Sequence, residues 1–293
     1  MKTSIKCTLV IAITIFLGCK KQDSVPVASE PAPNAYVRSD NASDDIDHQI
    51  FLVYKQTGIP ILYTDTLSRS PLNILNLNFQ IGGPSSIYQY TYPKKKADIL
   101  TGVNFIRDRI LPPLGSKIKI YSISLLDSLK TVIKYSATYS LTTNYSFVPG
   151  LTSFGIANIP KLATMSPGQL ATFRADVLTN ILIAPLNAST SLTGFYAVSA
   201  AYYSRYVYGT VTDASYLQYK DKKEYGFIPT GSESTSFYQL GDQTADLKDY
   251  LNKIFTMSAA DFQARYGAYP LVMSKYNLLK GALTSMGFDL TKI

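Results

Sequence analysis

The stretch SPGQLATFRADVLTNILIAP, residues 166–185, is the strongest structural signal in the chain. Its first four residues, Ser-Pro-Gly-Gln, form a capping box with proline at the first helical position, where the missing N–H costs nothing. We predict a helix from this box to about residue 184, ended by Pro185, which cannot continue the hydrogen-bond ladder. Apolar side chains surround this helix, so we expect it to be buried: Phe173, Val177, Leu178, Ile181, Leu182 and Ala184.

The remainder of the second half is also predicted to be helical. Ser258 can cap one helix with its side-chain oxygen, and Pro270 can open the next. Gly287 can close the last helix in the left-handed conformation that glycine adopts without strain. The predicted helices run over residues 244–256, 259–266 and 271–286.

The first half mixes helices with short strands. Ser43 before two aspartates is typical of a helix start, and Gly58 stands where a helix ends, which predicts a helix over residues 44–56. A second helix is predicted over residues 97–110. Pro60 cannot donate to a sheet ladder, so its strand is expected at an edge. The predicted strands are 59–63, 76–79, 118–123, 132–135 and 138–141.

Strands early and helices late predict a single α+β domain over residues 42–293, with a small mixed sheet. The sequence has no internal repeat and no second domain boundary. About 250 residues can bury a core without disulfides or metals.

The N-terminus predicts export and lipid anchoring. Lys2 and Lys6 precede an apolar run that ends at Leu17-Gly18-Cys19, which resembles a bacterial lipobox. The run is shorter than the roughly 20 residues that span a bilayer. We therefore expect a signal peptide over residues 1–18, lipid on Cys19, and a Pro- and Ser-rich tether over residues 19–41. The protein would be anchored in the cell envelope at the outer membrane, with the face of the membrane left open.

Composition excludes several classes of chemistry. Cys7 leaves with the signal and Cys19 carries lipid, so no thiol remains for disulfides, metal binding or nucleophilic attack. The charge of +8 comes from scattered cations, apart from the triplet 94–96, and an exported chain of this kind predicts no nucleic-acid partner. Neither a P-loop nor a G-x-G-x-x-G motif is present, so no cofactor is expected.

Tyrosine is the unusual residue, with 23 copies and no tryptophan. Residues 88–92 would place three rings on one face of a strand. A second group is crowded into residues 196–208, and exposed rings of this kind bind sugars and peptides. Packing with a wet hydroxyl is the alternative for either group. The ligand-binding candidates are Tyr196, Tyr202, Tyr203 and Tyr206.

The order of several segments resembles the substrate import-associated zinc metallohydrolase lipoproteins of Bacteroidetes, a zincin-like family encoded beside TonB-dependent importers. The resemblance implies a zincin-like fold. It also implies partners in the form of an importer and its substrate-binding lipoprotein. It rests on the helix near 46–47, the strand 58–63, the turn 155–157, residues 161–162, FYAVSAAY at 195–202, GFI at 226–228 and GFDL at 287–290.

The chain departs from the family at its catalytic motif. Counting back from the segment at 195–202 places the family's H-E-x-x-H on residues 179–183, so that Thr179, Asn180 and Ile183 replace the three working residues. Thr179 and Ile183 cannot hold zinc, and Asn180 cannot accept a proton as glutamate does. Asp249 matches a downstream acid of the family, but one carboxylate does not hold zinc.

A single histidine, His48, is present in the whole chain, which excludes a two-histidine zinc site and disfavours a Ser–His–Asp triad. We expect His48 to lie on the surface of its helix. The sequence therefore predicts no catalytic residues and no metal.

Three functions stay open. The preferred one is a non-catalytic binding or accessory lipoprotein, a pseudoenzyme that holds a peptide or glycan near an importer. The second is a carboxylate-based hydrolase acting on a glycan, and the third is a structural envelope protein. The carboxylates considered for the hydrolase are Glu224, Glu233, Asp242 and Asp246.

Overall fold

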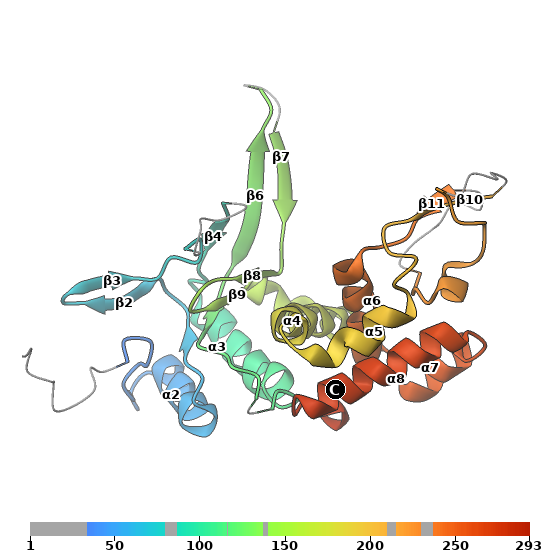
Figure 1. Cartoon of the computed structure of the whole chain (residues 1–293). Helices are drawn as coiled ribbons and strands as arrows, with labels where there is room; N and C mark the ends of the chain where they lie inside the picture. The colour runs from blue at the N-terminus through green and yellow to red at the C-terminus, as the bar shows by residue number, and fades with distance from the viewer. Residues whose placement is uncertain (1–33, 80–86, 116, 137–139, 210–214, 230–236) are drawn as a thin grey trace, which may run out of the picture. The chain divides into compact units, whose positions relative to one another are not determined.

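The computed structural model describes residues 34–79, 87–115, 117–136, 140–209, 215–229 and 237–293 (Figure 1). The predicted signal peptide, Cys19 and most of the predicted tether lie outside the described residues. Residues 35–293 form one compact unit. The unit thus begins seven residues before the expected boundary at 42, because Tyr36 and Arg38 pack onto the domain: the Tyr36 hydroxyl donates to Thr152 Oγ1 at 2.7 Å.

The first helix, α2, spans Asp45–Thr57. Asp44, rather than Ser43, supplies the cap by accepting from the Ile46 N–H. Gly58 ends the helix at φ 72°, as predicted. The buried face of α2 carries Ile46, Ile50 and Val53.

The first half of the chain contains a four-stranded mixed sheet, in the strand order β1-β5-β9-β8. Strands β1 (Ile61–Leu62), β5 (Ile123–Leu125) and β9 (Phe154–Ile156) run parallel, and β8 (Phe147–Pro149) is antiparallel to β9. The edge position of β1 confirms the expectation drawn from Pro60.

Gly155 lies in strand β9 rather than in the predicted turn. A Cβ at this position would meet the Val148 side chain at 2.6 Å, so the absence of a side chain lets β8 and β9 approach. The predicted strand 118–123 begins only at Ile123.

Two smaller sheets extend from the first half. Strands β2 (Thr66–Arg69) and β3 (Leu72–Ile74) form a hairpin, and β4 (Gln89–Thr91), β6 (Ser128–Lys134) and β7 (Ser140–Asn144) form an antiparallel sheet. The predicted strand 76–79 is wrong: the Asn78 N–H donates to Asn76 Oδ1, which folds these residues into a turn.

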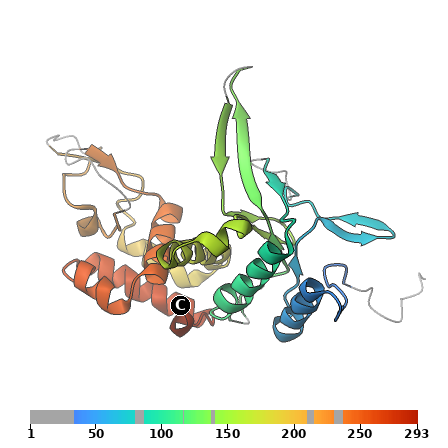
Figure 2. The same cartoon turned by 180° about the vertical axis from the view of Figure 1, so that it is seen from behind.

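Helix α3 spans Lys96–Phe105 and continues as a π-helical turn, η2, over Ile106–Ile110. It contacts α2 on one side, and η2 contacts α4 (Pro167–Asn187) on the other, so α3 lies between α2 and the later helices in both views (Figure 2). The short 3₁₀ helix η3 (Ile159–Thr164) packs beside α3.

Helix α4 opens with the predicted capping box of Ser166 and Gln169. It does not end at Pro185, however. Proline removes only its own donor, and the Ala188 N–H still donates to the Ala184 carbonyl at 3.0 Å, so the helix runs on to Asn187. Five of the six predicted core residues of this helix are buried, and the sixth, Ala184, is exposed.

The second half is helical, as predicted (Figure 1). Helix α6 packs against α4, α5 packs against α8, and α7 contacts both α6 and α8. The elements are η4 (Thr190–Leu192), α5 (Thr193–Val198), β10 (Tyr206–Tyr208), η5 (Lys222–Tyr225), β11 (Phe237–Gln239), α6 (Gln243–Thr256), α7 (Ala259–Tyr266), α8 (Pro270–Ser285) and η6 (Leu290–Lys292).

Within the described ranges, no single helix is long and apolar enough to cross a membrane. Helix α4 passes that test only together with residues 190–198, as a pair bent by 99°. Most of the apolar side chains of α4, among them Val177, Leu178 and Ile181, are buried in the main core.

Candidate functional site

The positions that match the lost zinc motif divide between the interior and the surface of α4. Thr179 is buried, and its hydroxyl has no hydrogen-bond partner. Asn180 is half-buried and donates to the Asp176 backbone carbonyl and to Asp176 Oδ1, at 2.9 and 3.1 Å. Ile183 is also half-buried and packs against the main core. At the positions that the resemblance assigns to metal ligands, the helix therefore carries a buried hydroxyl, a locally satisfied amide and a hydrocarbon side chain.

The fourth matching position, Asp249, lies on α6, which packs against α4. Burial raises the pKa of its carboxyl to about 6, and the neighbouring Asp246 charge adds to the increase. All four positions are described, yet no hydrogen bond or ion pair joins any two of them. The structure thus places them on two packed helices without assembling a polar centre.

A shallow hollow of about 560 Å³ borders α4 further toward its N-terminus. It is lined by Phe173 and Asp176 of α4 and by Asn252 of α6, with Gly168, Gln169 and Thr172. None of the four matching positions lines it.

Three residues before Asp249 on α6, Asp246 forms an ion pair with Lys275 of α8. Both side chains are 0% exposed. Asp246 Oδ2 accepts from Lys275 Nζ and, at 2.8 Å, from the Tyr203 hydroxyl. Lys275 Nζ also lies 3.3 Å from Ser199 Oγ, which donates to the Tyr225 carbonyl at 2.8 Å. Asp246 Oδ1 is buried without a partner.

Aromatic rings enclose the ammonium group of Lys275. Its Nζ lies 4.7 Å from the ring centroids of Phe195 and Phe227, 5.0 Å from Tyr250 and 5.5 Å from Tyr203. Burial lowers the pKa of Lys275 to about 8 and raises the pKa of Asp246 above its ordinary range, because desolvation disfavours both charges.

Gly226 allows one wall of this enclosure to close. It has φ 81°, and a Cβ there would meet Ser199 Oγ at 2.7 Å, while its carbonyl accepts from the Tyr250 hydroxyl at 2.9 Å. Both side chains of the pair are 0% exposed, so the pair is sealed among α5, α6 and α8 and offers no surface to a substrate.

The four tyrosines predicted to bind a ligand do not form one site. Tyr203 belongs to the Lys275 enclosure, and Tyr196 packs against it at 6.2 Å while its hydroxyl donates to Asn187 Oδ1 at 2.7 Å. Tyr202 packs on Tyr225 at 4.9 Å. These three are half-buried packing residues.

Tyr206 alone of the four lies on an exposed aromatic surface. It is 43% exposed and stacks on Phe237 at 5.4 Å, across the pair of β10 and β11. Tyr208 and Tyr216, which are 40% and 38% exposed, continue this surface.

The rings of residues 88–92 follow one face, as predicted, and pack against a buried cluster that includes Leu77 and Leu129. Tyr88 contacts Tyr145 at 5.4 Å, and burial raises the pKa of Tyr92. They do not form an exposed platform.

The carboxylates considered for a hydrolase are engaged in local structure where they are described. Glu224 accepts from the Asp221 N–H, Asp242 caps α6, and Asp246 is sealed with Lys275. Glu233 lies outside the described residues.

Zinc does not fit the residues of the matching positions, because Thr179, Asn180 and Ile183 supply none of its preferred ligands. In the part of the chain that the structure describes, no three His, Cys, Asp or Glu side chains lie close enough to hold a metal ion. His48 lies partly exposed on α2, and its Nδ1 is 2.7 Å from Asp40 Oδ1.

Sequence reasoning missed Lys275. A signal was available: Val272, Lys275 and Leu279 share one face of α8, so a cation stands in an apolar stripe. A lysine there is expected to have a buried partner.

No protein-family model, curated protein or solved structure matches this chain.

Proposed function

We propose that this protein is a lipid-anchored envelope protein on a zincin-like scaffold that binds or assists without catalysing a reaction, beside a TonB-dependent importer. The observation that carries the proposal is the state of α4. Its first matching position, Thr179, is buried, and the position one turn later, Ile183, is packed on the core. A close-packed interior of this kind leaves no ligands for a metal.

The internal ion pair supports the same proposal. A buried carboxylate needs a compensating cation, and in zinc enzymes the metal can supply it. Here Lys275 neutralises Asp246 from within the chain. Asp246 therefore has a counter-charge without an external ion.

Turnover assays on the purified mature protein test the proposal. We expect no hydrolysis of casein or of quenched-fluorescent peptides, with or without added zinc, and less than stoichiometric metal after dialysis. Metal-dependent hydrolysis that is abolished by a chelator would contradict the proposal. Turnover of a polysaccharide that is lost in Asp242→Asn would favour the hydrolase instead.

A further inference from the structure

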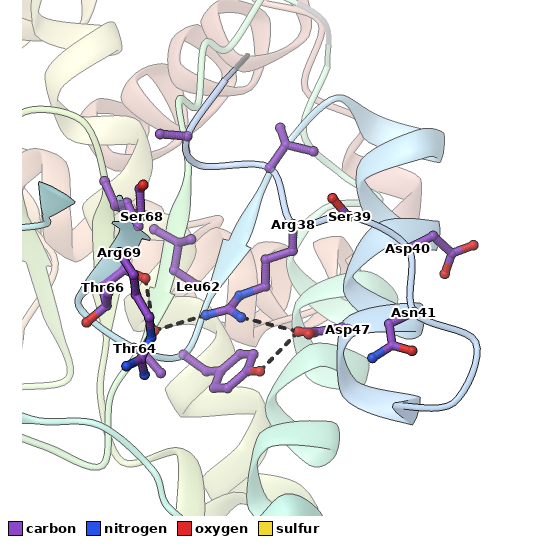
Figure 3. Close-up of a pocket in the computed structure, with 14 residues that line it drawn as sticks. Arg38, Ser39, Asp40, Asn41, Asp47, Leu62, Thr64, Thr66, Ser68 and Arg69 are labelled. Carbon is purple, nitrogen blue, oxygen red and sulfur yellow. Dashed lines mark hydrogen bonds and ion pairs between the residues drawn. The ribbon is translucent and has the colours of Figure 1, made fainter. Parts of the chain in front are cut away.

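A cavity of about 670 Å³ opens where strand β1 ends, and no residue of α4 lines it (Figure 3). Three segments line it: residues 35–41 ahead of α2, residues 62–64 at the end of β1, and residues 66–69 of β2, with Asp47 of α2 between them. We call it the Arg38 cavity. Polar groups dominate its wall, and they include two guanidinium groups, Arg38 and Arg69, and two carboxylates, Asp40 and Asp47.

The guanidinium group of Arg38 is held in a fixed position. It lies 4.4 Å above the ring of Tyr63, and its Nη2 donates to Thr64 Oγ1 at 3.0 Å. Its Nη1 is 3.5 Å from Asp47 Oδ1, which also accepts from the Tyr63 hydroxyl at 3.0 Å. Figure 3 shows both interactions of Arg38 directed along the wall of the cavity. A guanidinium positioned in this way loses little conformational entropy when it binds a ligand.

Most donors of this guanidinium are unused. Arginine carries five N–H donors, and Arg38 directs one to Thr64 and one, at the limit of hydrogen-bond distance, to Asp47. The Nε atom is buried and has no partner. Because Nε has almost no accessible surface, a ligand in the cavity would bind the remaining N–H donors of the two Nη atoms, which belong to the 27% of the side chain that is exposed.

The charged side chains that line the cavity determine which kind of ligand group can bind there. Two guanidinium groups favour an anion, and the planar fork of arginine matches a carboxylate. Asp40 and Asp47 on the same wall disfavour a doubly charged phosphate, while they can accept from hydroxyl or ammonium groups. Serine, threonine and asparagine side chains, among them Ser39, Asn41 and Thr66, add further polar partners.

We propose that the Arg38 cavity binds the carboxylate group of a small polar ligand, with Arg38 as its principal partner and Arg69 as a second. Sugar acids and free amino acids or short peptides share this chemistry, since both join a carboxylate to hydroxyl or ammonium groups. The proposal is independent of the state of α4: metal-dependent hydrolysis would overturn the proposed function and leave this cavity as it is.

Calorimetric titration of the mature protein tests the proposal with matched pairs of probes. One pair is galacturonate and galactose, and the other is dialanine and dialanine amide. We expect at least one carboxylated probe to bind and its neutral counterpart to bind at least about tenfold more weakly, since only the first can use the fork. The pair that responds identifies the source of the carboxylate.

Variants locate the binding. Arg38→Gln should weaken the carboxylated probe by about 10- to 100-fold, the range for a charge-assisted hydrogen bond, and Arg69→Gln by less. Arg265→Gln is the matched control, because Arg265 also lies over a tyrosine ring, that of Tyr266, but outside the cavity. This variant should bind as the wild type does.

Three results would overturn the proposal: equal binding of the neutral probes, no binding of any probe at about 1 mM, or unchanged binding in both Arg38→Gln and Arg69→Gln. If Arg38→Gln does not fold, as judged by circular dichroism, Arg69→Gln and the neutral probes still decide between the outcomes.

Discussion

Two ion pairs in this protein have similar chemistry and opposite surroundings. Lys275 and Asp246 are 0% exposed and enclosed by aromatic rings, whereas Arg38 and Asp47 are 27% and 21% exposed and line a cavity. In the first pair, four rings surround the lysine and Ser199 Oγ accepts from its Nζ, while the Tyr203 hydroxyl donates to Asp246. Each pair leaves one buried polar atom without a partner, Asp246 Oδ1 in the first and Arg38 Nε in the second, so exposure is the difference between them. The comparison separates a charge pair sealed between helices from one that a ligand in a cavity can approach.

Removing one member of the sealed pair should have the largest effect. Lys275→Met leaves Asp246 charged and buried, and we expect a loss of about 3–5 kcal/mol in the free energy of unfolding. Urea denaturation followed by circular dichroism measures it. The double variant Asp246→Asn/Lys275→Met, which removes both charges with little change in volume, should recover most of the loss. A double variant no more stable than the single one would mean that the pair itself, rather than the uncompensated charge, provides the stability.

The raised pKa of Asp249 predicts that the stability of the fold depends on pH. Its pKa in the folded protein is raised to about 6, so the folded state binds the proton more tightly than the unfolded state does. Stability from this residue is therefore present at acidic pH and lost as the pH rises from its unfolded pKa through about 6. Asp249→Asn should raise the melting temperature near neutral pH and leave it almost unchanged near pH 4. If the variant shifted the melting temperature equally at both pH values, burial would not raise the pKa of Asp249 in the folded protein.

Thr179→Val tests whether the environment of residue 179 on α4 is that of an apolar core. The hydroxyl of Thr179 is buried without a partner, and valine has the same shape without the polar atom. We expect a gain of about 1 kcal/mol in stability, or about 2–4 °C in melting temperature. A loss of stability in thermal denaturation would indicate that the hydroxyl has a partner in solution, such as an ordered water.

The open pair should contribute least to stability. Arg38→Gln removes a partly exposed ion pair, for which we expect a loss below about 1 kcal/mol, well under that of Lys275→Met. The same urea denaturation measures both variants. If Arg38→Gln instead costs as much as Lys275→Met, the cavity is a structural element and the contrast between the two pairs fails.

Local chemistry predicted the helices well because their ends are encoded within a few residues. The capping box at Ser166, the cap at Ser258 and the left-handed glycines Gly58 and Gly287 all stand where the sequence places them. The α+β arrangement follows from the order of these segments. The zincin-like family stays a prediction.

Where the sequence misled, the cause was either a local side-chain hydrogen bond or a partner far along the chain. The segment 76–79 has the composition of a strand, but its asparagines satisfy the backbone locally and fold it into a turn. Residues 35–41 resemble a tether in composition, and only contacts such as those of Arg38 with Thr64 and of Tyr36 with Thr152 place them in the domain. The pairing of Lys275 with Asp246 joins residues 29 positions apart, which sequence pattern alone does not connect.

The affinity of the mature protein for zinc tests the central claim most directly, because it asks whether α4 and α6 retain a metal centre. Titration of zinc into the apoprotein near neutral pH, followed by calorimetry, should give no one-to-one site in the micromolar range or below. A single tight site that is lost in Asp249→Asn would contradict the account.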